Sequence, residues 1–155
     1  MSTAAEFQPV DAGYADRVRA SFAAQPAMAT LGASLADVSP GRVVLTMCHR
    51  PELTQQHGFL HAGIVSTALD SACGYAGYSL MPADAAVLTI EFKINLLAPA
   101  RGPWFRFEGQ VTKAGRTITV VDGRALQATG EGVEACLFAT MTTTVMTLRG
   151  RGISG

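Results

Sequence analysis

The segment from Leu53 to Ala83 contains a single Asp, Glu, Lys or Arg, and that residue is Asp70. Residues 61–81 have a helical pattern that is rich in small side chains, and Pro82 ends it. This helix is apolar on nearly every side, so it has to lie in the interior of the protein rather than on its surface. The rest of the chain must therefore surround it.

Alternating apolar residues predict strands after this helix. The clearest alternation covers residues 88–96, and further strands are expected near 105–111, 116–128 and 135–145, joined by short turns that favour antiparallel pairing. Before the helix we expect a short amphipathic helix over residues 10–22, two strands at 27–37 and 41–48, and a polar loop at 51–60. This order predicts an α+β fold in which an antiparallel sheet wraps around a long central helix.

The size and charge of the chain narrow its class. Its 155 residues fit one domain. Twelve basic residues balance twelve acidic ones, which argues against nucleic acid or an anionic membrane as a partner. Charged residues make up 15% of the chain, against ~25% in a typical soluble domain. We take this shortage to indicate apolar surface that is buried between subunits.

The compartment that we expect is the cytoplasm. The three cysteines are odd in number and far apart, which excludes a disulfide framework and disfavours a thiolate zinc site. The first residues lack the basic and apolar regions of a signal peptide. Polar residues interrupt the most apolar stretch, residues 62–81, so we expect no membrane span.

Asp70 and the approach to its helix carry the chemistry. A carboxylate that is buried among apolar residues either caps a backbone donor or serves a reaction. The helix begins near Ala62 and Gly63, where free amide groups could bind a carbonyl oxygen, although the glycines could also serve only the turn. Asp70 lies seven residues beyond Gly63, about 10 Å along the helix axis. Two antiparallel helices from two subunits could bring the acid and the amides together.

A stripe of small residues supports two interpretations of this helix. The stripe consists of residues at spacings of four, three, four and three: Gly63, Thr67, Asp70, Gly74 and Gly77. It would allow close contact with a neighbouring subunit, or equally close packing of the helix on the sheet within one chain.

The run His57-Gly58-Phe59-Leu60-His61-Ala62-Gly63, followed by Asp70 and Gly74, resembles the PaaI-like acyl-CoA thioesterases of the hotdog fold. The segment 87–99 with its final proline, and the hairpin at 113–117, are similar to the same family. The resemblance covers residues 27–147, which we take as the hotdog core. Residues 1–26 would then be an N-terminal helical extension of a single domain spanning 1–155.

The resemblance implies a role for each matching residue. Asp70 would be the general base or the nucleophile, and the amides of Ala62 and Gly63 would polarise the thioester carbonyl. His61 would help to shape this oxyanion hole, and Thr89 would help to position water. Gln55 stands where many members have Asn, so the placement of water is expected to differ.

Substrate binding is expected from the loop and from basic side chains. Phe59 and Leu60 could line an acyl pocket or belong to the core, as could Tyr75 and Tyr78. Among the basic residues, Lys113 and Arg116 could hold the phosphates of coenzyme A or lie free in solvent.

We expect no cofactor and no metal. His57 and His61 have a spacing found in metal sites, but Gly58 replaces the Glu of the HExxH motif and the segment is loop.

These features together predict an acyl-CoA thioesterase that forms a homodimer, with two dimers pairing into a homotetramer. A thioester has a good leaving group, so an acid, amide donors and a slot suffice, and the sequence lacks the GxSxG motif of α/β-hydrolases. Two alternatives stay open. One is a hotdog dehydratase or hydratase that pairs His61 with Asp70. The other is a non-catalytic module that binds acyl-CoA.

Overall fold

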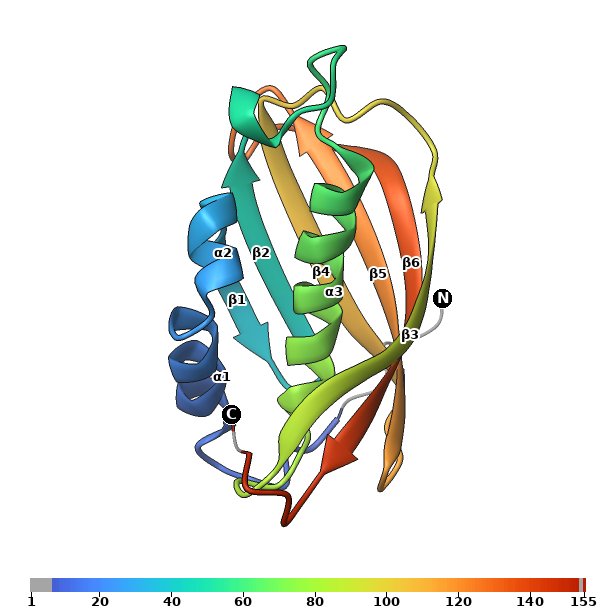
Figure 1. Ribbon diagram of the computed structural model, residues 1–155. Helices are drawn as coiled ribbons and strands as arrows, with labels where there is room; N and C mark the ends of the chain where they lie inside the picture. The colour runs from blue at the N-terminus through green and yellow to red at the C-terminus, as the bar shows by residue number, and fades with distance from the viewer. Residues whose placement is uncertain (1–6, 154) are drawn as a thin grey trace.

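The computed structural model describes residues 7–153 and 155 (Figure 1). Two short helices, α1 (Tyr14–Ala23) and α2 (Pro26–Leu31), precede the strands β1 (Ser34–Ser39) and β2 (Arg42–Cys48). A 3-10 turn, η1 (Pro51–Leu53), and a loop lead into the long helix α3 (Ala62–Tyr78). The chain then forms four strands, namely β3 (Ala86–Leu96), β4 (Trp104–Lys113), β5 (Ile118–Ala128) and β6 (Cys136–Leu148).

The six strands form one antiparallel sheet in the order β1-β2-β4-β5-β6-β3. The sheet curves around α3, and α1 and α2 lie beside β1 at its far edge (Figure 1). The predicted α+β class and the wrapping of the sheet around a central helix are therefore confirmed. Among the described residues, no helix combines the length and the hydropathy that a bilayer span requires.

Two glycines set the distance between α3 and the sheet. Gly109 on β4 pairs directly with Gly123 on β5. A Cβ atom on Gly109 would lie 2.4 Å from the carbonyl oxygen of Ala72, and one on Gly123 would lie 2.9 Å from Sγ of Cys73. The backbone of the helix therefore rests on side-chain-free positions of the strands. Burial in this contact raises the pKa of the Cys73 thiol, which keeps it protonated.

Both interpretations of the small-residue stripe describe part of it. A Cβ atom on Gly77 would lie 2.8 Å from Cγ2 of Val145, so this end of the stripe packs on the sheet. At Gly74 the same atom would meet nothing within 4 Å, and Gly63 is exposed. The end that includes Asp70 therefore faces away from the sheet.

The expected strand over residues 27–37 is wrong in its first part. Pro26 begins helix α2, since its fixed φ suits the first turn of a helix, and Gly32 ends the helix in the left-handed conformation at φ 67°. The strand starts only at Ser34. The first helix begins at Tyr14 and excludes Val10, which is exposed, so the four-residue spacing extended the prediction too far.

Candidate active site

Asp70 lies on α3 opposite β3, half-buried. The hydroxyl of Thr89 on β3 donates a 2.8 Å hydrogen bond to Oδ1 of Asp70. Burial raises the pKa of the Asp70 carboxyl, and the hydrogen bond from Thr89 partly opposes this rise. The structure therefore brings two predicted site residues together, around a carboxyl that takes up a proton more readily than an exposed Asp does.

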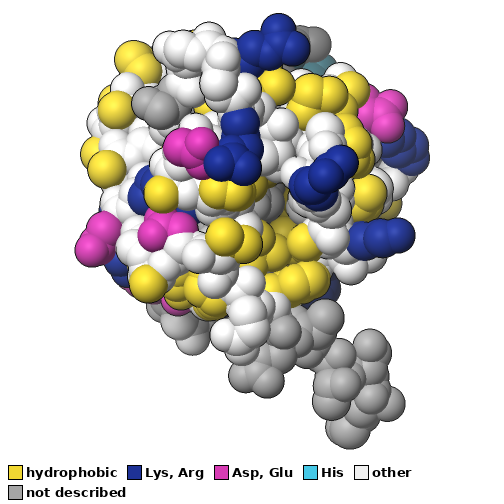
Figure 2. Space-filling view, turned by 90° about the horizontal axis from the view of Figure 1, so that it is seen from below, with side chains coloured by type: hydrophobic (Ala, Val, Ile, Leu, Met, Phe, Trp, Pro, Cys, Tyr) yellow, Lys and Arg dark blue, Asp and Glu magenta, His cyan; other side chains and the backbone are white. Residues whose placement is uncertain are grey.

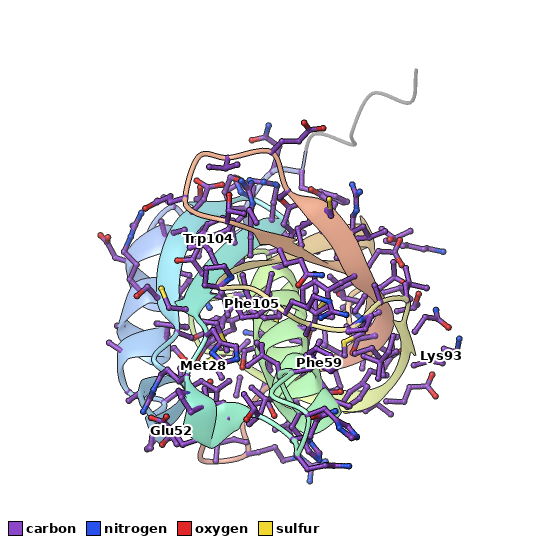
Figure 3. The ribbon with its side chains drawn as sticks, turned by 90° about the horizontal axis from the view of Figure 1, so that it is seen from above. Met28, Glu52, Phe59, Lys93, Trp104 and Phe105 are labelled. Atoms are coloured by element: carbon purple, nitrogen blue, oxygen red, sulfur yellow. The ribbon has the colours of Figure 1, made fainter. Side chains whose placement is uncertain are left out.

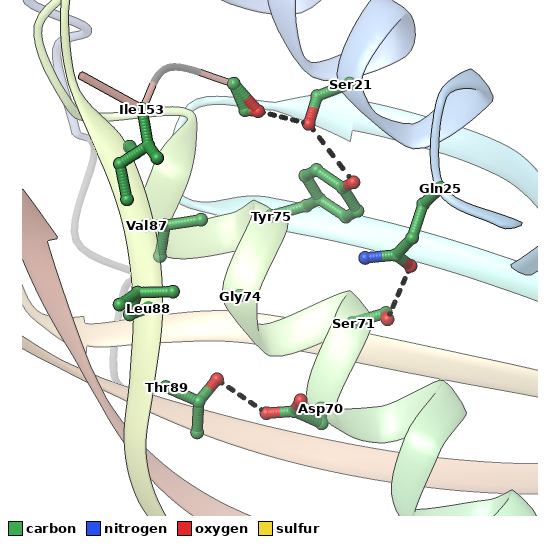
Figure 4. Close-up of a pocket in the computed structure, with 12 residues that line it drawn as sticks. Ser21, Gln25, Asp70, Ser71, Gly74, Tyr75, Val87, Leu88, Thr89 and Ile153 are labelled. Atoms are coloured by element: carbon green, nitrogen blue, oxygen red, sulfur yellow. Dashed lines mark hydrogen bonds between the residues drawn. The ribbon is translucent and has the colours of Figure 1, made fainter. Parts of the chain in front are cut away.

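Asp70 and Thr89 line a cavity of about 420 Å³ between α3, β3 and the end of α1 (Figure 4). Its walls combine small or apolar positions with polar groups: Ser21, Gln25, Ser71, Gly74, Tyr75, Ala86, Val87, Leu88, Ile153 and Gly155. The acid lies at one end and the phenol of Tyr75 at the other, five residues further along the helix, or about 7.5 Å along its axis. The cavity is therefore large enough to take a small acyl group whose carbonyl lies beside Asp70.

The far end of this cavity carries a hydrogen-bond network. Ser21 Oγ donates to the carbonyl oxygen of Gly155 at 2.5 Å and lies 3.2 Å from the hydroxyl of Tyr75. Because Ser21 has one hydroxyl proton, Tyr75 is the donor in the second bond and keeps free lone pairs. Burial raises the pKa of Tyr75, so its hydroxyl stays protonated.

Gln25 adds a donor to the same end. Its Oε1 accepts a 3.2 Å hydrogen bond from Ser71, while its amide nitrogen points into the cavity (Figure 4). Among the described residues no acceptor is found for this nitrogen. The far end therefore offers one donor and one acceptor to a ligand.

The start of α3 holds the predicted amide donors. His61 is the N-cap, and its Nδ1 accepts a 2.9 Å hydrogen bond from the amide of Gly63. Nδ1 must be unprotonated to accept, so the imidazole is neutral or carries its proton on Nε2. The amide of Ala62, at the first helical position, has no partner within the helix. Both Ala62 and Gly63 are exposed, so a ligand can reach this end.

A second cavity, of about 410 Å³, lies on the side of the helix start that faces the end of β3. It is mostly apolar and is lined by Gln55, Phe59, Leu60, Ala62, Val65, Leu96, Leu97, Ala98, Pro99, Ala100 and Phe138. Leu60 is buried and also belongs to the core, whereas Phe59 is half-buried and its ring lies 4.7 Å from the guanidinium of Arg101. Gln55 Oε1 accepts from the amide of His57, which fixes the loop. The predicted loop residues thus gather around one cavity.

Within one chain, the acid and the amides line different cavities. Asp70 and Thr89 line the first, Ala62 lines the second, and His61 and Gly63 line a shallow third one beside Thr54. No cavity in the described part of the chain combines Asp70 with the start of α3.

The predicted phosphate-binding residues lie apart from both cavities. Lys113 ends β4 and Arg116 follows in the hairpin to β5, at the lower end of Figure 1. Both are exposed, and Arg116 lines a small hollow with the C-terminal part of α3. Viewed from this end, several basic side chains surround apolar surface (Figure 2).

Sequence reasoning missed part of the first cavity. Tyr75 was a candidate, and Tyr78 is core, but Ser21, Gln25, Ser71 and Ile153 were not singled out. Ser21 and Gln25 lie in a segment whose pattern shows only a short helix, and no local signal places that helix beside α3. Among the described residues, no group of three His, Cys, Asp or Glu side chains has metal-binding geometry.

Comparisons with known proteins agree with this architecture. A family model described as the thioesterase superfamily matches residues 57–134. A predicted esterase of Saccharolobus solfataricus is 35% identical over 102 residues, covering 65% of this chain and 71% of that protein. The crystal structure of a thioesterase family protein from Silicibacter pomeroyi is 58% identical, with a TM-score of 0.85, covering 89% of this chain and all of that one (100%).

The fold is also that of the PaaI protein from the phenylacetic acid degradation operon of E. coli. That structure has a TM-score of 0.79 at 19% identity, and the match covers 88% of this chain and 94% of the other. With a family model that spans half of its length and a 58% identical relative, the chain belongs to the thioesterase superfamily.

Proposed function

We propose that the protein hydrolyses acyl-CoA thioesters to a free acid and coenzyme A. Family membership supports thioester hydrolysis in general. The observation that carries the finer proposal is the half-buried carboxyl of Asp70, held by Thr89 at one end of a cavity of acyl size.

Asp70 acts on the thioester carbonyl carbon, either directly as a nucleophile or by taking a proton from an attacking water. The carbon–sulfur bond breaks and the coenzyme leaves as a thiolate, which needs little protonation. Amides at a helix start stabilise the negative charge that develops on the carbonyl oxygen. Ala62 offers a free amide, and the amide of Gly63 becomes available when the imidazole of His61 yields to the substrate.

The separation of the acid from the amides supports a site that two chains share. The exposed end of the small-residue stripe includes Gly63, Thr67 and Asp70. If two copies of this face pack antiparallel, Asp70 of each chain lies opposite the helix start of the other. The proposal therefore includes a homodimer with two sites. The pairing of two dimers into a tetramer, and the contact of Lys113 and Arg116 with phosphates, stay predictions that sedimentation equilibrium and charge-removing variants can test.

The far end of the cavity supports a preference among acyl groups. A hydroxyl group both donates and accepts, so it could satisfy Tyr75 and the amide nitrogen of Gln25 together. We therefore expect an acyl group that carries a hydroxyl roughly 7.5 Å from the end where Asp70 lies.

The decisive experiment measures release of free thiol from a panel of acyl-CoA substrates. We expect turnover that Asp70→Asn abolishes while binding of acyl-CoA persists. Hydration of enoyl-CoA without thiol release would favour the dehydratase class, and binding without turnover would favour a binding module.

Mixed dimers test the shared site. Chains with Asp70→Ala are assembled with chains carrying Gly63→Pro, since proline is tolerated in the first turn of a helix and removes the amide. We expect each parent to be inactive and the mixed dimer to regain one working site. Verified mixed dimers without activity would reject the shared site.

A further inference from the structure

The two edges of the sheet differ in their protection. Edge β1 has six residues, contains Asp37 and is interrupted by a bulge, all of which discourage pairing with another strand. Edge β3 has eleven residues and pairs on one side only, with β6. It exposes large apolar side chains, with 52% of Leu88, 52% of Ile90 and 44% of Phe92 accessible. A long apolar edge of this kind needs a covering strand.

The occupant that fits is a second copy of β3, and this step rests on the proposed function, whose shared site needs a second chain. A two-fold axis pairs one edge with itself, and the two strands then run antiparallel. The sheet of one copy would continue into the sheet of the other.

The position of the axis follows from how α3 and β3 lie together. Asp70 is beside Thr89, and at the other end Ala62 and Val65 share a cavity with Leu96. An axis that exchanges Asp70 with Gly63 passes α3 midway between them. The matching point on β3 lies midway between Thr89 and Leu96, near residues 92–93.

Charge then selects one register. Side chains that pair across a continuous sheet lie on the same face, so the axis must pass through a residue rather than between two. An axis at Lys93 would oppose two ammonium groups, and an axis at Glu91 would oppose two carboxylates. An axis at Phe92 places Glu91 opposite the partner's Lys93 on both sides, and opposite charges that face each other across strands are stabilising.

We propose that β3 pairs with β3 of a second copy in the antiparallel register centred on Phe92, with Glu91 facing the partner's Lys93. Lys93 is free for this role because its side chain points away from the body of the molecule at this edge (Figure 3). The carboxylate of Glu91 accepts from Thr144 on the outer face of the sheet. The bulge between Thr89 and Glu91 ends the regular register on that side.

Single cysteines map this register. The background carries Cys48→Ser and Cys136→Ser, since both of these thiols are exposed. Under mild oxidation we expect Phe92→Cys to form a disulfide-linked dimer, because residues on the axis lie within the Cα separation that a disulfide spans. Glu91→Cys and Lys93→Cys should cross-link with each other in mixed samples and not with themselves. Self-cross-linking that is strongest at position 91 or 93 would overturn the register.

Charge exchange provides a second measurement that needs no cysteine. By sedimentation, Glu91→Lys and Lys93→Glu should each weaken the dimer at least ~5-fold, because each opposes like charges twice. The double variant should return to within about 2-fold of the parent. Glu134→Lys, an exposed site outside the strands, is the matched control and should leave the dimer unchanged. Additive losses in the double variant would contradict the pairing.

These outcomes separate the two proposals. A dimer that cross-links at Phe92 but releases no thiol from acyl-CoA would reject the hydrolase and keep the register. An active enzyme that cross-links elsewhere would do the reverse.

Discussion

The hydroxyl of Thr89 donates to Asp70 from the neighbouring strand, so β3 directly controls the acid on α3. This bond favours the charged carboxylate, while burial favours the neutral form. The balance of the two decides at which pH the acid is ready to act.

Removal of the Thr89 hydroxyl should shift the pH dependence of the reaction. In Thr89→Val the opposing hydrogen bond is lost, so the pKa of Asp70 rises further and the acidic limb of kcat/KM moves to higher pH. Thr89→Ser keeps the hydroxyl and should keep the limb in place. An unchanged limb in the Val variant would show that the bond does not tune the acid.

Replacement of the acid should trade activity for stability. Because burial raises the pKa of Asp70 above its unfolded value, its ionisation destabilises the fold as the pH rises through the folded pKa. Asp70→Asn should therefore lower kcat by at least ~10²-fold and raise Tm at pH 7. The gain in Tm should disappear below the unfolded pKa of an Asp. Thermal unfolding of both proteins across this pH range tests the sign.

Loss of the helix cap should weaken the fold. In His61→Ala the amide of Gly63 loses its acceptor, and we expect the free energy of unfolding to fall by about 1 kcal/mol. His61→Asn supplies a side-chain acceptor at the same position and should recover most of the loss. Urea unfolding of the three proteins measures this, and equal stability would mean that the cap contributes nothing.

The far end of the acyl cavity should govern substrate choice. Tyr75→Phe removes one hydrogen-bonding group, which is worth about 1 kcal/mol, so kcat/KM for a hydroxylated acyl-CoA should fall about 5-fold. Turnover of the matching acyl-CoA without the hydroxyl should stay within about 2-fold. Equal losses on both substrates would indicate a change of packing rather than of recognition.

The elements that sequence reasoning placed well are those with strong periodicity. The helix around Asp70 and the alternation over residues 88–96 both have long, regular apolar patterns, and the structure has α3 and β3 there. Helix α2 was missed because it has six residues and depends on Pro26 and Gly32 rather than on a pattern.

For the candidate site, local motifs identified residues but not their neighbours. Asp70 and Gly63 were evident because a lone acid and a glycine at a helix start are unusual in an apolar segment. The contribution of Ser21 and Gln25 depends on how α1 lies against α3, which is a long-range contact that no short stretch of sequence encodes.

The seat of α3 on Gly109 and Gly123 has a consequence for how such an enzyme can diversify. The floor beneath the acid is polypeptide backbone, and any added methyl there would lift the whole helix. The roof, which is built from α1 and the residues near Ile153, has no such restriction. New acyl preferences can therefore be engineered by changing the roof alone, with the reactive group left at its original height.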